Sequence, residues 1–188
     1  GIVVIPNDRH VHTRPVPAVG GAAMFAGLLA ALATAWSMSA FDDVFIAPSD
    51  IVGLLVASSV MYAVGLLDDL RPVSAPAKTA GMVLAASVLS ISGVSLLVFR
   101  IPFFQLLVLS SDWSALLTVL WVVGIANAVN LIDGLDGLAA GIVGIAGATF
   151  WLYSMELLDQ DVLLPGNPGA LIAAIIVGLC VGFLPHNF

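Results

Sequence analysis

The chain has little of what water-soluble and secreted proteins depend on. Only 9% of its 188 residues are charged, against about a quarter in an average soluble domain. The single cysteine, Cys180, excludes a disulfide framework and a cysteine-based metal site. Five basic residues stand against 12 acidic ones, for a formal net charge of -7, and we expect no nucleic-acid partner.

What the chain has instead is apolar sequence in long uninterrupted runs. Hydrophobic residues make up 61% of it, and the mean hydropathy is +1.13. A soluble core of this size cannot hide so much apolar surface, and runs of this length are typical of segments that cross a bilayer. The sequence therefore predicts an integral membrane protein.

Six runs of about 15 to 22 residues have nearly the length that a hydrocarbon core requires. Unpaired backbone groups are costly in lipid, which favours helices, and no stretch alternates like a barrel strand. The predicted fold class is all-α, a polytopic transmembrane helix bundle forming one domain over residues 1–188. The predicted spans are Ala18–Ser39, Ile51–Leu67, Thr79–Phe99, Trp113–Leu131, Leu138–Met155 and Ala170–Leu184.

Both ends of the chain suggest truncation. The last predicted span is short and meets Pro185, three residues before the sequence stops. The opening Gly1–Ile5 resembles the tail of a missing span and lacks the basic start of a signal peptide. We therefore expect a chain truncated at the C-terminus and also at the N-terminus.

The connecting segments fall into two sets with different charge. Residues 6–17, 68–78, 132–137 and 185–188 contain four of the five basic residues, whereas residues 40–50, 100–112 and 156–169 contain only Arg100. The positive-inside rule places the first set in the cytoplasm. The second set, read as solvated outer loops, contains Asp42, Asp43, Asp50, Asp112, Glu156, Asp159 and Asp161.

Two adjacent carboxylates, Asp68 and Asp69, end the second predicted span on its cytoplasmic side. Burying them unpaired is costly, so such a pair usually has a cation. Neighbouring helical residues point about 100° apart, and both serve one site only where the helix ends or bends. Pro72 and Pro76 supply that end. Taken alone, the pair fits a solvated helix terminus equally well.

A more specific pattern recurs every third residue at Asn127, Asn130, Asp133 and Asp136. On a helix this spacing stacks two amides and two carboxylates along one face. The glycines that follow each Asp loosen the backbone, so we expect the stripe at a broken or fraying helix end. Because burying four polar groups for packing alone is costly, the stripe indicates a site.

Two basic features leave alternatives open. Residues 6–21 carry arginines, histidines and a glycine pair that opens a helix, and they suit either a positive-inside anchor or a phosphate site. Lys78 is either a snorkelling anchor or a phosphate contact.

Together these motifs resemble the polyprenyl-phosphate N-acetylhexosamine-1-phosphate transferases over nearly the whole chain. The Pro6-Asn7-x-Arg9 opening resembles the bacterial branch that uses UDP-N-acetylglucosamine (UDP-GlcNAc) more than the translocase that uses UDP-MurNAc-pentapeptide. The matching pieces are Pro6-Asn7-x-Arg9 with His12, Pro15-x-Pro17-x-x-Gly20-Gly21, Gly65-Leu66-Leu67-Asp68-Asp69, Asn130-Leu131-x-Asp133-Gly134-Leu135-Asp136-Gly137-Leu138 and Phe183-Leu184-x-x-Asn187.

The resemblance implies an Mg²⁺-dependent transfer, with Mn²⁺ as a substitute, of sugar-1-phosphate from a UDP-sugar to polyprenyl phosphate, releasing UMP. This would be the first membrane step of cell-envelope glycan synthesis, at the cytoplasmic face of the bacterial inner membrane, and it allows a homodimer. The implied metal ligands are Asp68, Asp69 and Asp133, which with Asp136 form the catalytic set. The implied substrate-binding residues are Asn127, Asn130, Lys78, Arg14, His12 and Asn187.

The chain departs from the family pattern in two places. Gly81 is followed by Met82, where the family commonly has glutamine. The family's Gly-Asp and His-rich motifs, which lie beyond Asn187, are absent, so the chain alone is expected to be inactive.

A transporter is the alternative from another class, and it predicts carboxylates near the bilayer midplane. The carboxylates here fall at the cytoplasmic ends of spans, which favours the enzyme. A purely structural scaffold is disfavoured by the polar stripe.

Overall fold

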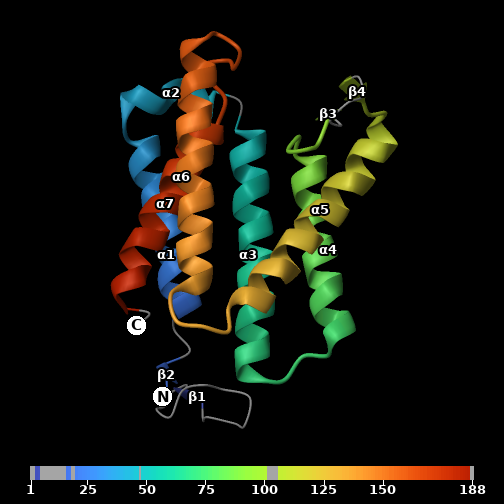
Figure 1. Ribbon diagram of the computed structural model, residues 1–188, viewed down its shortest axis with the longest axis vertical. Helices are drawn as coiled ribbons and strands as arrows, with labels where there is room; N and C mark the ends of the chain where they lie inside the picture. Colours follow the sequence, from blue (N-terminus) through green and yellow to red (C-terminus); the bar gives the residue numbers. More distant parts are fainter. Residues whose placement is uncertain (1–2, 5–15, 18–19, 47, 101–105, 187–188) are drawn as a thin grey trace. The chain divides into compact units, whose positions relative to one another are not determined.

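The computed structural model describes residues 3–4, 16–17, 20–46, 48–100 and 106–186, and these residues are mainly helical (Figure 1). Two short antiparallel strand pairs accompany the helices: β1 (Val3–Val4) with β2 (Val16–Pro17), and β3 (Val98–Arg100) with β4 (Leu106–Val108). The α-helices are α1 (Gly20–Trp36), α2 (Asp42–Phe45), α3 (Ser49–Leu70), α4 (Ala75–Ile91), α5 (Ser111–Ile132), α6 (Leu138–Asp159) and α7 (Gly169–Phe183), with 3-10 turns η1 (Ser39–Phe41) and η2 (Leu184–His186).

The helices confirm an all-α, multi-pass membrane protein. Within the described residues, four helices are long and apolar enough to cross a bilayer: α3, α5, α6, and α7 continued through η2. A fifth candidate is α1 together with Ser39–Phe45, two segments that meet at a bend of 94°. Helix α4 has 17 residues and is shorter than these spans.

Helix α5 buries two polar side chains and exposes large apolar ones. Its buried residues are Ser114 and Thr118, whereas Trp113, Leu120 and Trp121 are between 57% and 60% exposed. A water-soluble helix buries its apolar face. This inverted arrangement is what a lipid environment requires.

The chain forms two compact units. In the first, residues 49–128, helices α3 and α4 run antiparallel and pack together (Figure 1). The packing depends on small residues: a Cβ atom at Gly53 would collide with the Ser92 side chain, and one at Gly81 would collide with Val64. Such glycines let helix backbones approach closely, as is common in membranes.

The predicted span Thr79–Phe99 is wrong at both ends. Helix α4 begins at Ala75 because Pro76 suits a first helical turn, and it ends at Ile91. Gly93 then adopts a φ of 107°, which stops the helix. The residues beyond it pair as strands, with Val98 opposite Val108.

In the second unit, which contains residues 129–188 and the N-terminal segment through α2, helices α6 and α7 pack side by side and α1 packs on α7 (Figure 1). A Cβ atom at Gly144 would lie 3.2 Å from the Cβ of Cys180, and one at Gly20 would lie 3.1 Å from the Phe183 ring. The start of α1, the start of α6 and the end of α7 therefore share one end of this unit.

The connection between α6 and α7 lies at the other end of this unit, close to α2. A Cβ atom added at Gly166 would lie 2.9 Å from the Asp43 carbonyl oxygen. The predicted inner and outer segments of this unit thus fall at opposite ends. Of the opening segment Gly1–Ile5, the structure describes Val3–Val4, which is extended and pairs with residues 16–17.

Candidate functional site

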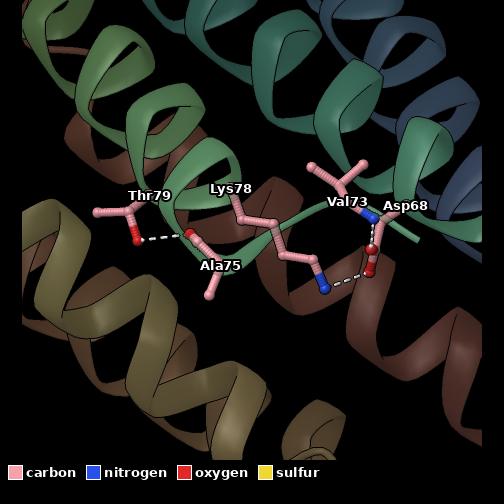
Figure 2. A network of polar contacts seen from close by, with 5 residues as sticks. All are labelled: Asp68, Val73, Ala75, Lys78 and Thr79. Atoms are coloured by element: carbon pink, nitrogen blue, oxygen red, sulfur yellow. Dashed lines mark hydrogen bonds and ion pairs between the residues drawn. The ribbon is translucent and has the colours of Figure 1, made fainter. Parts of the chain in front are cut away.

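The predicted cation partner of the aspartate pair is Lys78. Its Nζ atom lies 2.6 Å from Asp68 Oδ2, and the backbone N–H of Val73 donates a 3.1 Å hydrogen bond to Asp68 Oδ1 (Figure 2). Asp68 occupies the last turn of α3, and Lys78 the first turn of α4. The tight connection between the two helices brings these side chains together.

The connection itself explains the geometry. Helix α3 ends at Leu70, and Ser74 has an extended backbone with φ -63° and ψ 147° before α4 begins. The chain therefore reverses within a few residues. The predicted ending of the helix just after the aspartates is confirmed, and the Val73 N–H is a contact that the side-chain pattern alone did not predict.

The pair is accessible to solvent. The side chain of Lys78 is 38% exposed and that of Asp68 is 33% exposed, while Asp69 is exposed. Ion pairs open to solvent stabilise a fold by about 1 kcal/mol or less. Lys78 can therefore exchange Asp68 for another anion at little cost to the fold.

Asn127 lies on α5 and contacts α4. Its Nδ2 group donates to the Val123 carbonyl oxygen at 2.8 Å and to Met82 Sδ at 3.4 Å. An amide nitrogen has two hydrogens, so these two contacts use both of them. The polar stripe did not predict that Asn127 joins two helices. In the sequence, the departure from the family pattern at Met82 was the feature that could have pointed to this contact between α5 and α4.

The remaining stripe residues lie where α5 ends. Asn130 is exposed in the last turn of the helix. Asp133 is the first residue beyond it and donates its N–H to the Val129 carbonyl oxygen at 3.1 Å. Asp136 follows in a turn, and Gly137, with a φ of 70°, leads into α6. The predicted helix break is confirmed, so the four residues do not continue as one helical face.

The turn at residues 133–137 holds a carboxyl group, that of Asp133, whose pKa is raised. Protein atoms around the Asp133 carboxyl partly desolvate it and raise its pKa, although the residue is exposed overall. The turn precedes α6 and therefore shares its end of the unit with the start of α1 and the end of α7. The predicted contacts His12, Arg14 and Asn187 lie outside the described residues.

The chemistry of the three predicted metal ligands, each taken by itself, fits a hard cation. Asp68, Asp69 and Asp133 offer carboxylate oxygens without sulfur or imidazole, the kind of ligand that Mg²⁺ prefers. Within the part of the chain that the structure describes, no three His, Cys, Asp or Glu side chains are grouped to hold a metal. Asp68 is held by Lys78 and Val73, so its use as a ligand requires Lys78 to move or to share it.

Comparison with known proteins identifies the family of the chain. The family described as Glycosyl transferase family 4 matches residues 51–188. The decaprenyl-phosphate N-acetylglucosaminephosphotransferase of Mycobacterium leprae is 42% identical over 99% of this chain and 48% of its own length. The protein of that name from Mycobacterium tuberculosis H37Rv is 41% identical over 100% of this chain and 47% of its own length.

A more distant relative comes from another bacterial group. The probable undecaprenyl-phosphate N-acetylglucosaminyl 1-phosphate transferase of Bacillus subtilis is 33% identical over 66% of this chain and 33% of its own length. No solved structure matches the chain. The chain spans about half the length of the mycobacterial relatives. The family match covers the aspartate pair, Lys78 and the whole polar stripe, and the chain belongs to glycosyl transferase family 4.

Proposed function

We propose that the full-length protein transfers N-acetylglucosamine-1-phosphate from UDP-GlcNAc to a polyprenyl phosphate and releases UMP. The observation that carries the proposal is the solvent-accessible pair of Asp68 and Lys78, next to Asp69, at the end of α3. A carboxylate and a cation in one small site suit a reaction between phosphates. The names of the mycobacterial relatives supply the sugar phosphate and the lipid acceptor.

The reaction balances as a single phosphoryl transfer. An oxygen of the lipid phosphate attacks the β-phosphorus of UDP-GlcNAc and forms a new diphosphate bond. The bond from that phosphorus to the bridging oxygen breaks, and UMP leaves with the electron pair. When bound, Mg²⁺ would neutralise the charge that gathers on the phosphate oxygens, and Asp68, Asp69 and Asp133 would hold it.

The chain's own residues have separate tasks. Lys78 leaves Asp68 and binds a phosphate oxygen, since charge-assisted hydrogen bonds to phosphate are strong. The released Asp68, or its neighbour Asp69, accepts the proton that a monoprotonated lipid phosphate gives up. Asn130, Asp133 and Asp136 orient the nucleotide.

The proposal places this chemistry at the cytoplasmic face of the bacterial inner membrane. The basic residues around the aspartate pair favour that side, and UDP-GlcNAc is a soluble cytoplasmic donor. The polyprenyl tail would lie in the bilayer beside the lipid-facing helices. A homodimer is compatible with this site but is not required by it.

Double labelling tests the reaction. Membranes containing the full-length protein receive polyprenyl phosphate and UDP-GlcNAc carrying ³²P at the β-phosphate and ³H in the sugar. We expect both labels in the lipid fraction in equal amounts, together with UMP. Transfer of ³H alone with release of UDP would show glycosyl transfer instead, and incorporation only from UDP-MurNAc-pentapeptide would identify the translocase.

A further inference from the structure

The β3–β4 hairpin exposes apolar side chains on both of its faces. Leu97 is 59% exposed, Val98 49%, Leu107 49% and Val108 71%. Val98 stands opposite Val108 and shares a face with it, while Leu107, next to Val108 in the strand, points to the other face. A two-stranded hairpin is marginally stable in water. Because apolar side chains are exposed on both faces, the hairpin is not expected to be surrounded by water.

The length of α4 sets the depth at which the hairpin begins. Its 17 residues extend about 25 Å, whereas a hydrocarbon core is about 30 Å thick. Lys78, in the first turn, belongs at one membrane boundary. Ile91, 13 residues after Lys78, therefore lies about 20 Å from that boundary, and the residues that follow α4 cover the remaining depth to the opposite boundary.

A buried contact fixes the root of the hairpin within the membrane, below the start of α5. The backbone N–H of Leu96 donates to Thr118 Oγ1 at 2.9 Å, and that hydroxyl donates to the Ser114 carbonyl oxygen at 2.7 Å. Thr118 is only 4% exposed. It lies seven residues into α5, about 10 Å along the helix from its first residue. The hairpin is thus attached to the side of a membrane helix, below that helix's end.

The unpaired edges of the hairpin limit how deep it can go. A two-stranded ribbon leaves backbone N–H and C=O groups unpaired on both outer edges, and such groups are not tolerated in hydrocarbon. At the headgroup boundary these groups find water while the side chains meet acyl chains. Trp113, in the first turn of α5, is 60% exposed, and tryptophan is enriched at this boundary.

We infer that the β3–β4 hairpin lies in the membrane interface of the leaflet opposite Asp68 and Lys78, with Leu97, Val98, Leu107 and Val108 in contact with lipid. The lipid-facing surface of α5 continues directly into this hairpin. The partner of these apolar hairpin side chains is the bilayer itself, at the boundary between headgroups and acyl chains. The hairpin thereby fixes the depth of the short helix α4, which carries Lys78 at its other end.

Depth-dependent fluorescence quenching tests this inference. The full-length protein, in a Cys180→Ala background, is labelled with the fluorophore NBD at Val108→Cys and reconstituted in phosphatidylcholine–phosphatidylglycerol nanodiscs. We expect emission at shorter wavelength than for the exposed turn residue Ser74→Cys. Lipids spin-labelled at acyl carbon 5 should quench Val108→Cys at least about twofold more than lipids labelled at carbon 12, which is the pattern of an interfacial group.

The other outcomes contradict the inference. Iodide quenching equal to that of Ser74→Cys would mean that the hairpin stands in water, and stronger quenching from carbon 12 would mean that it enters the core. Protection from both quenchers would mean that protein covers it. Leu107→Cys, on the other face, must behave like Val108→Cys, because packing of only one face would protect one label and not the other.

Discussion

Lys78 Nζ lies 2.6 Å from Asp68 Oδ2, so a cation in the first turn of α4 pairs with a carboxylate in the last turn of α3. The two residues are ten positions apart and come together because the chain reverses between them. Both side chains remain partly exposed. A pair of this kind adds little to stability, and its position at the end of two packed helices suits exchange with a phosphate.

Lys78→Gln separates the two roles of this lysine. If Lys78 binds substrate phosphate, loss of its charge should raise the KM for the UDP-sugar about tenfold or more, since a hydrogen bond to a charged group is worth about 1.5–3 kcal/mol. The melting temperature of the purified full-length protein should hardly change. An unchanged KM with a lower melting temperature would show that the lysine serves only the fold.

Met82 tests the contact between α4 and α5. Met82→Gln replaces a weak sulfur acceptor for the Asn127 amide with an oxygen, which should stabilise the protein by about 0.5–1 kcal/mol. Met82→Leu keeps the volume but removes the acceptor, and it should lower stability by a similar amount. Thermal unfolding in detergent distinguishes the variants. Equal melting temperatures for all three proteins would show that the Asn127–Met82 contact is energetically neutral.

The topology predicts the direction of chemical labelling. Single cysteines at Ser49 and Ser74, again with Cys180→Ala, are treated in intact cells with a membrane-impermeant maleimide. Only Ser49→Cys should react from outside, and Ser74→Cys should react only after the cells are opened. External labelling of Ser74→Cys would overturn the cytoplasmic assignment of the aspartate pair.

Metal dependence follows from the carboxylate donor set. Activity of the full-length protein should disappear with EDTA and return with Mg²⁺ or Mn²⁺, because a diphosphate substrate and several carboxylates repel one another without a cation. The measurement is lipid-linked label at matched protein concentration. Full turnover after thorough chelation would contradict the proposed reaction.

Hydropathy and motif spacing predicted the helices and the polar ends of the spans well. The break after Ile132 was predictable because glycines follow each aspartate, and the end of α3 was predictable from Pro72. The predicted C-terminal end of the span Thr79–Phe99 was wrong because hydropathy does not distinguish a buried helix from a short apolar strand. Gly93, with its positive φ, marks the point where the helix stops.

Contacts between distant residues were less predictable. The sequence indicated that the aspartate pair has a cation, but Lys78 is one of several basic residues in the inner segments. Its selection depends on how tightly residues 71–74 turn. In the same way, the attachment of Asn127 to Met82 depends on how α5 meets α4, and no periodicity within one helix reports that.

The most direct test of the central claim compares four carboxylate substitutions in the full-length protein. Asp68→Asn and Asp133→Asn nearly preserve shape while they remove a negative charge, so we expect a loss on the order of a hundredfold or more in rate with normal membrane accumulation. Asp42→Asn and Asp159→Asn, in the predicted outer loops, should leave turnover within about twofold. Turnover near wild type for Asp68→Asn and Asp133→Asn, at matched protein levels, would contradict the assignment of these carboxylates to phosphosugar transfer.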